Sequence, residues 1–461
     1  MKNIAAIILA AGKGTRMKSK LPKVLHQVCG FPMLHYPIAQ LRSLKAGRII
    51  VVTGYGGDAV REAFPDKKIA FAVQKEQLGT GHAVMQAMGA LKGFAGDVLI
   101  LSGDVPLITH ETVDGLVRFH RGGGKGRPAL TLVTAVVAEP SGYGRIIRDE
   151  NNSVVRVIEE KDCKGGERRI QEVNAGIYIV RSEFLFENLK KLKNRNAASE
   201  YYLPDLIGMA VKAGRKARAL THIDAGEVMG INNRVELAEA NRIMRERIAD
   251  ELMRSGVTII DPLNAYIDSG VKVGADTVIY PGAHLLGHTV IGADCVIEEG
   301  SRIKDSAVGS GSTVRSYSII ESTMTGKDVA IGPFARLRPG NVIADKVRIG
   351  NFVEVKNSSV GKGTKANHLS YIGDAVVGAG VNIGAGTITC NYDGAKKHRT
   401  VIEDGAFIGS DTQLVAPVRV GKGAYVGSGT TVTKDVPPGA LVITRVKERV
   451  IEDWAKKRMK P

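Results

Sequence analysis

The sequence predicts an α/β protein built from three consecutive parts: an α/β sheet domain, a helical linker and a parallel β-helix of hexapeptide repeats. Three observations lead to this prediction. Short apolar runs alternate with amphipathic stretches up to about residue 231, a segment without Pro or internal Gly follows, and aliphatic residues then recur every six positions. We therefore expect domains at 1–231 and 256–461, joined by a linker at 232–255.

The first domain has the pattern of a Rossmann-like sheet in which helices separate the strands. The runs expected to form strands are Ile4–Ala11, Ile49–Thr53, Val98–Leu101, Leu130–Val137 and Gly176–Val180, and the stretches expected to form helices are His82–Leu91 and Glu111–His120. Ligands of open α/β sheets bind outside the carboxyl ends of the strands, so the functional residues are expected there.

The segment after residue 231 predicts one helical connector. Asn232 or Asn233 is a candidate N-cap, and Gly256 is a candidate stop.

The second half has a period of six residues, which fits neither an amphipathic helix nor a simple alternating strand. The repeating aliphatic positions are Ile267, Val273, Ile279, Leu285, Ile291, Ile297 and Ile303, and then Ile402, Ile408, Leu414, Val420, Val426 and Val432. This repeat is typical of a parallel β-helix, in which each hexapeptide forms one face of a triangular coil and its aliphatic residue points inward. The phase slips near 321–328 and between 389 and 402, and we interpret both slips as loops.

The composition favours a soluble globular protein with anionic small-molecule partners. The 461 residues are 44% hydrophobic and 24% charged, and 64 Lys+Arg against 47 Asp+Glu give a net charge of +17. The basic residues are scattered, without a base-stacking aromatic set or a helix-turn-helix pattern, so we expect no nucleic-acid partner. No apolar run is long enough to cross a bilayer, and we expect a cytoplasmic protein without membrane contact.

The cysteines predict neither disulfides nor a zinc site. Cys29, Cys163, Cys295 and Cys390 lie far apart without a C-x-x-C pair, and we expect them to be small buried apolar residues.

The stretch "LAAGKGTRMKSKLPK" follows the first predicted strand and has the features of an anion-binding loop. Gly12 and Gly14 allow the backbone to approach a phosphate, and Arg16 and Lys23 add positive charge. The stretch lacks the G-x-x-x-x-G-K-[ST] pattern of a P-loop, and Met17 stands where a dinucleotide fingerprint has its third glycine. A plain strand-to-helix turn would explain the glycines but not the bases.

The spacing Leu9-x2-Gly12-x-Gly14-Thr15-x-Met17-x4-Pro22-Lys23 resembles the signature of nucleotide-sugar pyrophosphorylases, and the hexapeptide half resembles left-handed β-helix acyltransferases. Together they resemble one bacterial family, the bifunctional N-acetylglucosamine-1-phosphate uridylyltransferases and glucosamine-1-phosphate acetyltransferases. This resemblance implies that acetyl-CoA acetylates glucosamine-1-phosphate and that UTP then converts the product, with Mg²⁺, into UDP-N-acetylglucosamine and pyrophosphate. It also implies a homotrimer that supplies peptidoglycan and lipopolysaccharide precursors.

The resemblance implies a nucleotide and sugar site in the first half. The residues that match the UTP and UDP-N-acetylglucosamine contacts of the family are Leu9, Ala10, Ala11, Gly12, Lys23, Gln74, Gly79, Thr80, Ser102, Gly103, Asp104, Gly144, Glu159, Asn174 and Asn232. Asp104 and Asn232 match its magnesium ligands, and both carry the oxygen donors that Mg²⁺ prefers. A cation is needed because the sugar phosphate and the α-phosphate of UTP are both anions. No general base is needed, since the sugar phosphate is already ionised.

The resemblance implies a second site in the β-helix. His368 matches the general base, and a neutral imidazole with a pKa of about 6.5 can take a proton from the attacking amine near pH 7. The residues that match the glucosamine-1-phosphate contacts are Arg338, Lys356, Tyr371 and Asn382, and those that match the acetyl-CoA contacts are Ala385, Asn391, Tyr392, Ser410, Ser428 and Arg445. Ser428 stands where some members have alanine. Glu354 could orient the amine or the imidazole, or be a solvated edge residue.

Two alternatives remain at this stage. One is another sugar-1-phosphate nucleotidylyltransferase whose β-helix tail regulates rather than catalyses. The other is a non-catalytic scaffold subunit that reuses both folds. His368 and the "NYDG" stretch speak against the first alternative, and the presence of Lys23, Asp104, Asn232 and His368 speaks against the second.

Overall fold

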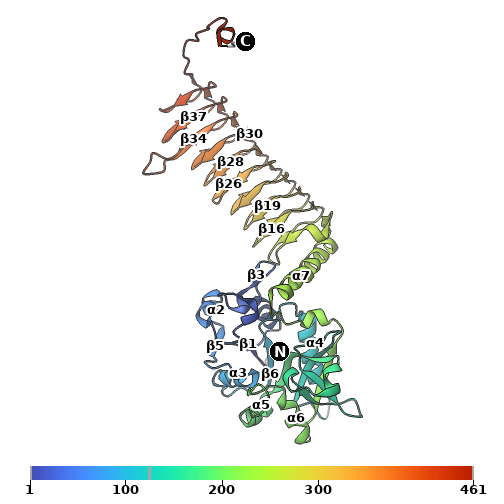
Figure 1. Cartoon of the computed structure of the whole chain (residues 1–461). Helices are drawn as coiled ribbons and strands as arrows, with labels where there is room; N and C mark the ends of the chain where they lie inside the picture. Colours follow the sequence, from blue (N-terminus) through green and yellow to red (C-terminus); the bar gives the residue numbers. More distant parts are fainter. Residues whose placement is uncertain (1–2, 123–125, 459–461) are drawn as a thin grey trace. The chain divides into compact units, whose positions relative to one another are not determined.

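The computed structural model describes residues 3–122 and 126–458, which form two compact units, one ending at Met244 and one beginning at Arg245 (Figure 1). The first unit contains a nine-stranded mixed sheet, and the second contains three sheets of parallel strands. The predicted α/β class, with a sheet domain followed by a parallel β-helix, is confirmed.

The sheet of the first unit has the order β11-β7-β10-β6-β1-β4-β5, with β8 and β9 joined to β10. Its strands are β1 Ile4–Ala10, β4 Arg48–Thr53, β5 Ile69–Val73, β6 Asp97–Ser102, β7 Leu130–Val136, β8 Arg145–Arg148, β9 Val154–Ile158, β10 Glu172–Arg181 and β11 Ala217–His222. The strands β6, β1, β4 and β5 run parallel, whereas β10 is antiparallel to β6 and β7.

Helices cover both faces of this sheet. They are α1 His35–Ser43, α2 Gly57–Ala63, α3 Thr80–Ala87, α4 His110–Arg121, α5 Ser182–Asn188 and α6 Asp205–Lys212, and the small pair β2 Gln27–Val28 and β3 Phe31–Pro32 lies apart from the sheet. Successive side chains of β1 point to opposite faces, so that Ile4, Ala6 and Ile8 join one core and Ala5 and Ile7 join the other. A strand buried on both faces needs a continuous apolar run, which β1 has.

The second unit is a parallel β-helix whose short strands stack coil upon coil, as the column from β16 to β37 shows (Figure 1). One sheet contains β12 Thr258–Ile259, β15 Val278–Ile279, β18 Val296–Ile297, β21 Thr313–Val314, β24 Ala330–Ile331, β27 Arg348–Asn351, β30 Lys365–His368, β33 Asn382–Ile383, β36 Phe407–Ile408, β39 Tyr425–Val426 and β41 Leu441–Val442. The second contains β13 Tyr266–Ile267, β16 His284–Leu286, β19 Arg302–Lys304, β22 Ile319–Glu321, β25 Arg336–Leu337, β28 Glu354–Lys356, β31 Tyr371–Gly373, β34 Ile388–Cys390, β37 Gln413–Val415 and β40 Thr431–Val432. The third contains β14 Lys272–Val273, β17 Val290–Ile291, β20 Ala307–Val308, β23 Thr323–Thr325, β26 Asn341–Ile343, β29 Ser359–Val360, β32 Ala375–Val377, β35 Thr400–Ile402 and β38 Val418–Val420.

The six-residue repeat corresponds to the inward side chains of these coils. Of the repeating aliphatic positions all are buried except Val273, which is half-buried and packs against the same core. One slip in the repeat was misinterpreted as a loop, because 321–328 contains β23, which pairs in register with β26. The second slip is a loop, since between Cys390 and Thr400 the only pairing among the described residues is an isolated bridge from Tyr392 to Lys397.

The linker region is the helix α7, Arg234–Arg254, and its first turn is capped. Asn233 Oδ1 accepts hydrogen bonds from the backbone N–H groups of Val235 and Glu236, both at 2.9 Å. Asn233 is therefore the N-cap. At the chain end the helix α8 spans Trp454–Arg458.

Three of the cysteines, Cys29, Cys163 and Cys295, are buried as expected, but Cys390 is only half-buried, at the end of β34 beside the loop. Among the described residues no helix is both long and apolar enough to span a lipid bilayer.

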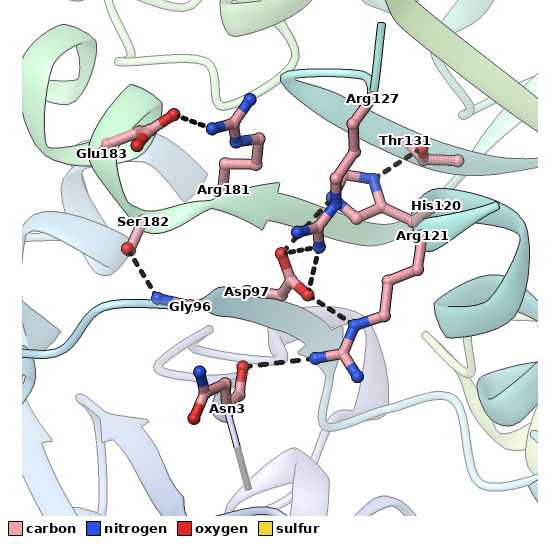
Figure 2. A network of polar contacts seen from close by, with 10 residues as sticks. All are labelled: Asn3, Gly96, Asp97, His120, Arg121, Arg127, Thr131, Arg181, Ser182 and Glu183. Carbon is pink, nitrogen blue, oxygen red and sulfur yellow. Dashed lines mark hydrogen bonds and ion pairs between the residues drawn. The ribbon is translucent and has the colours of Figure 1, made fainter. Parts of the chain in front are cut away.

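A buried carboxylate fixes the start of β6 (Figure 2). Asp97 is 2% exposed and forms ion pairs with Arg121, at 2.8 Å from Nε, and with Arg127, while His120 Nε2 lies 3.6 Å away. Burial alone would raise the pKa of Asp97, but the contacts from these three side chains outweigh it and hold the pKa below its usual value. This network joins β6 to the end of α4 and to the chain entering β7.

Replacing this carboxylate is expected to destabilise the first unit. Asp97→Asn leaves two guanidinium groups without their anion, so the free energy of unfolding should fall by about 3 kcal/mol. In the folded chain the pKa of the Asp97 carboxyl group lies below its value in the unfolded chain, which is about 4. The stabilisation by this carboxylate is therefore fully present above pH 4 and is lost as pH falls through the lower pKa of the folded chain. Hydrogen exchange of the β6 amides in the full chain measures the effect.

The matched control is Asp114→Asn on α4, where Asp114 pairs with the exposed Arg118 at 3.0 Å. This substitution should lower the free energy of unfolding by less than about 0.5 kcal/mol. Equal β6 protection in the two variants at neutral pH would contradict the prediction.

Candidate functional site

The predicted nucleotide residues meet at one edge of the first sheet. Leu9 lies beside Ser102 in the β1–β6 register, and Gly103 N–H donates to Leu9 O at 2.9 Å. On the other side of β1, Ala10 is paired with Thr53 of β4, whose carbonyl accepts from Gln74 N–H at 2.8 Å. The strands are parallel, so their carboxyl ends lie on this edge. The loop after β1, Ala11 and Gly12 included, therefore lies among Gln74, Ser102 and Gly103.

The loop after β1 packs directly against Lys23. Gly14 has φ +59°, and a Cβ at this position would lie 2.7 Å from Lys23 Cβ. Only glycine fits such a positive φ and such a close approach without strain. Gly12 is exposed, and a Cβ there would meet no atom within 4 Å. The loop backbone is thus open to a ligand at Gly12, while Gly14 allows Lys23 to approach it.

Lys23 forms an ion pair with Asp104, and its Nζ also donates to Asn232 Oδ1 at 3.1 Å. The side chains of Lys23 and Asp104 are 14% and 21% exposed. Asn232 lies more than two hundred positions along the chain from Lys23. It is brought here because Ile231 N–H donates to Asp104 O at 2.9 Å.

The amide of Asn232 is oriented by its neighbours. Its Nδ2 donates to Gly230 O at 3.1 Å, so its oxygen points toward Lys23 and Asp104. Its backbone N–H donates to Glu236 Oε2 at 2.6 Å, which ties the residue to the first turn of α7.

The residues suit a divalent cation, because one carboxylate and one amide oxygen already converge on the ammonium group of Lys23. No cluster of three or more His, Cys, Asp or Glu side chains able to hold a metal occurs in the described part of the chain. Phosphate oxygens and water would therefore have to complete the coordination of Mg²⁺.

The predicted sugar residues lie together. Asn174 N–H donates to Gly144 O at 2.8 Å, and a Cβ on Gly144 would lie 3.3 Å from Glu159 Oε1. Asn174 stands at an irregularity of the β10–β7 pairing, where its Nδ2 donates to Tyr178 OH at 2.6 Å.

Glu159 has an unusual protonation equilibrium. Burial raises its pKa to about 7, and the charges of Glu200, Asp162 and Asp205 act in the same direction. The carboxyl group is therefore close to half-protonated at neutral pH.

The remaining nucleotide residues begin at the end of β5. Gln74 is 3% exposed, and its Nε2 donates to Gly79 O at 3.1 Å. Gly79 has φ +98°, and a Cβ there would clash with Glu200 and with Tyr201 O. Thr80 begins α3, and its Oγ1 accepts from Leu203 N–H at 3.1 Å. These contacts hold the segment from Gln74 to Thr80 in place.

In the second unit, the predicted catalytic base is held by a neighbour one coil away. His368 ends β30 and is paired with Asn351 of β27, and its Nδ1 lies 3.1 Å from Asn351 Oδ1. If Nδ1 carries the proton and donates to this oxygen, Nε2 is left as the basic nitrogen.

The predicted sugar-phosphate residues lie on neighbouring coils. Glu354 and Tyr371 are paired across β28 and β31, and Asn382 follows on β33, next to β30. Arg338 Nη1 forms an ion pair with Glu354 Oε1 at 3.1 Å. Glu354 thus pairs with Arg338, and the roles considered for Glu354 in orienting the amine or the imidazole stay predictions.

A second lysine joins Lys356. The side chain of Lys397, on the loop after β34, contacts Lys356, and this contact and the charge of Lys356 hold the pKa of Lys397 below its usual range. On the same coils Asn391 Nδ2 lies 3.4 Å from Tyr371 OH and also donates to Asp374 Oδ2 at 2.5 Å. Two neighbouring ammonium groups favour an anion between them.

The predicted acetyl-CoA residues follow one corner of the β-helix. Asp411 N–H donates to Ala385 O at 2.7 Å, and Gly429 N–H donates to Ser410 O at 2.8 Å, so these positions stack on successive coils. A Cβ on Gly409 would lie 2.5 Å from Ser428 N, which shows how closely the coils pack. Arg445 Nη1 donates to Ser428 O at 3.3 Å, whereas Tyr392 is 60% exposed on the loop.

Asn351, Lys397 and Glu236 were not predicted as site residues from the sequence. A signal existed for Asn351, because it precedes His368 by 17 residues, close to the three hexapeptides of one coil. Lys397 lies in the expected loop between 389 and 402, and its charge was counted only among the scattered basic residues. Glu236 carried no signal beyond its place in the first turn of the predicted helix.

Comparisons with known proteins agree with this arrangement. Residues 6–172 match the model of the MobA-like NTP transferase domain, residues 262–348 that of the GMPPB C-terminal domain, and residues 399–434 that of the six-repeat bacterial transferase hexapeptide. The bifunctional protein GlmU of Geotalea uraniireducens is 50% identical over 459 residues, covering 99% of this chain and 100% of that protein. GlmU of Pelobacter propionicus is 50% identical over 98% of both chains, and GlmU of Geotalea daltonii is 51% identical over 98% of this chain and 99% of that protein. With half of its residues shared over nearly its whole length, the chain belongs to the family of the bifunctional protein GlmU.

Proposed function

We propose that the chain makes UDP-N-acetylglucosamine in two steps: acetyl transfer from acetyl-CoA to glucosamine-1-phosphate, then uridylyl transfer from UTP to N-acetylglucosamine-1-phosphate. We assign the uridylyl transfer to residues 1–231 together with Asn232, and the acetyl transfer to 256–461. The observation that carries this proposal is the convergence of Lys23, Asp104 and Asn232 beside the glycine loop. These three side chains come from distant positions, and together they can hold a metal-bound triphosphate.

Uridylyl transfer forms a bond from a sugar-phosphate oxygen to the α-phosphorus and breaks the bond to pyrophosphate. The glycine loop would hold the triphosphate, and Gly144, Glu159 and Asn174 would hold the amino sugar. Mg²⁺ held by Asp104 and Asn232 would screen the charge of the reacting phosphates. This chain then needs to supply orientation and positive charge but no proton acceptor.

Acetyl transfer needs a neutral amine, because a protonated amine has no lone pair for the thioester. With Nδ1 of His368 donating to Asn351, Nε2 can accept the proton of the amine. Arg338, Lys356 and Lys397 supply the charge for the sugar phosphate, and Arg445 supplies charge for the coenzyme. The coenzyme would then follow the corner formed by Ala385, Ser410 and Ser428.

A regulatory β-helix tail is the alternative. The GMPPB C-terminal model covers only 262–348, whereas His368, its partner Asn351 and the lysine pair lie beyond that range. A tail without catalysis would not need a positioned histidine, so we favour catalysis there.

We also infer a homotrimer in the cytoplasm. Tyr317, Phe334 and Phe352 form an exposed ladder on successive coils, with ring centroids 5.5 and 5.4 Å apart, and each is about half exposed. Leu369 is also exposed and directly follows His368. Exposed apolar patches of this kind favour association with another chain. A neighbouring chain on this ladder would pass close to the catalytic base.

The metal ligand and the base should serve different reactions. Asp104→Ala removes the carboxylate that pairs with Lys23, so uridylyl transfer should fall at least about a hundredfold while acetyl transfer continues. His368→Ala should lower acetyl transfer by about 10²–10⁴-fold and leave uridylyl transfer intact. Separate assays of the two reactions on the full chain measure this, and loss of both activities in one folded variant would refute two independent centres.

The pKa of Glu159 predicts a pH-dependent sugar affinity. As pH rises through about 7, the ionised carboxylate becomes the better acceptor for sugar hydroxyl and amide groups, so the KM for N-acetylglucosamine-1-phosphate should fall. Glu159→Gln should remove this inflection, and Glu200→Gln should move it to lower pH. Titration of the sugar phosphate itself is common to all variants and cancels in the comparison. The prediction fails if Glu159→Gln keeps the inflection of the unsubstituted chain.

The trimer predicts complementation between inactive chains. If His368 and Arg445 of one acetyl-CoA site come from different subunits, co-refolded mixtures of His368→Ala and Arg445→Ala should recover part of the acetyl transfer that each lacks alone. Sedimentation equilibrium gives the assembly state. A monomer that acetylates at full rate would exclude the proposal.

A further inference from the structure

The ammonium group of Lys23 occupies the position where a divalent cation would bind. It forms an ion pair with Asp104 and donates to Asn232 Oδ1 at 3.1 Å, so one cation already contacts both of the proposed metal ligands. Gly230 O fixes the amide of Asn232 in the orientation that this contact needs. With the side chains of Lys23 and Asp104 only 14% and 21% exposed, water screens this pair weakly.

A divalent cation and the ammonium group cannot both occupy this place. Each would stand within about 3 Å of the same carboxylate oxygen, and like charges at such a separation repel strongly where water is scarce. The chain offers little compensation, since the described residues contain no cluster of three or more metal-ligating His, Cys, Asp or Glu side chains. A metal ion that binds without nucleotide would therefore have to displace the Lys23 ammonium group and would gain only two oxygen ligands from the protein.

The Lys23 side chain can move without the loop. The close approach of Gly14 concerns only the base of the Lys23 side chain, whereas the ammonium group is carried on the flexible chain of methylene groups beyond Cβ. The nearest place for an anion is the glycine loop, which packs on the same residue. A triphosphate in that loop would offer the ammonium group new oxygen partners and release Asp104 for the metal.

We propose that Lys23 acts as an internal cation that keeps the metal position occupied until nucleotide arrives, so that metal and nucleotide bind as a coupled pair. This inference rests on the roles given to Asp104 and Asn232 under the proposed function. By linkage the coupling is reciprocal, because bound metal also frees Lys23 for the phosphates. Lys23 is thus a positioning residue for the metal as well as a phosphate contact.

The test measures Mn²⁺ binding to the full chain without nucleotide. The amount of unbound ion is read from its electron paramagnetic resonance signal. Lys23→Met removes the ammonium group but keeps the length of the side chain, so Mn²⁺ should bind on the order of tenfold more tightly than to the unsubstituted chain. Lys23→Arg keeps the positive charge and should bind Mn²⁺ as weakly as the unsubstituted chain. Loss of the ordered Asp104–Asn232 pair would weaken binding at this site, and the double variant below separates a gain at this site from binding elsewhere.

The double variant Lys23→Met, Asp104→Ala identifies the site, because it should lose the gained affinity. If Lys23→Met binds Mn²⁺ no more tightly than the unsubstituted chain, the inference is overturned, while the assay of uridylyl transfer in Asp104→Ala still decides the proposed function. If the double variant keeps the gained affinity, the ion binds elsewhere, and both the inference and the metal role of Asp104 are overturned.

Discussion

In-register pairing of parallel strands is the constraint on which both units depend. In the first unit it places the carboxyl ends of β1, β4, β5 and β6 on one edge, so that residues far apart in the chain meet there. In the second unit the same pairing stacks equivalent positions of successive coils, which brings Asn351 beside His368. Neither arrangement depends on a single strong contact. Each follows from many strands that share one register. A slip of one residue in a strand would turn each of its side chains to the opposite face of the sheet.

The two sites handle anionic substrates in different ways. In the first unit the positive charge of Lys23 is paired with the carboxylate of Asp104. In the second unit Lys356 and Lys397 stand close together and leave a positive centre in place. The cation of the first site is thus neutralised by a carboxylate of the chain, whereas the second site keeps two cations side by side.

Much of the fold followed from periodicity, because a repeat of six residues and an apolar run buried on both faces are properties of the local sequence. The strand β23 was missed because its buried residue is Thr323, which does not continue the aliphatic repeat. The site residues were named from resemblance, and their roles remain proposals. The sequence did not show which distant side chains contact one another in the folded chain. The cluster around Asp97 joins β6 to α4 and to the chain before β7, and this neighbourhood is set by the strand order of the sheet.

The capped first turn of α7 has a consequence for where the chain can be divided. Glu236 accepts from the backbone of Asn232 through Oε2 and contacts the side chain of Asn233 through Oε1, so the turn that begins the helix also holds the proposed metal ligand. A fragment cut at residue 232 would keep every residue assigned to the nucleotide but lose this support. We therefore expect the smallest self-sufficient uridylyl unit to extend beyond its last proposed ligand contact and to end inside α7.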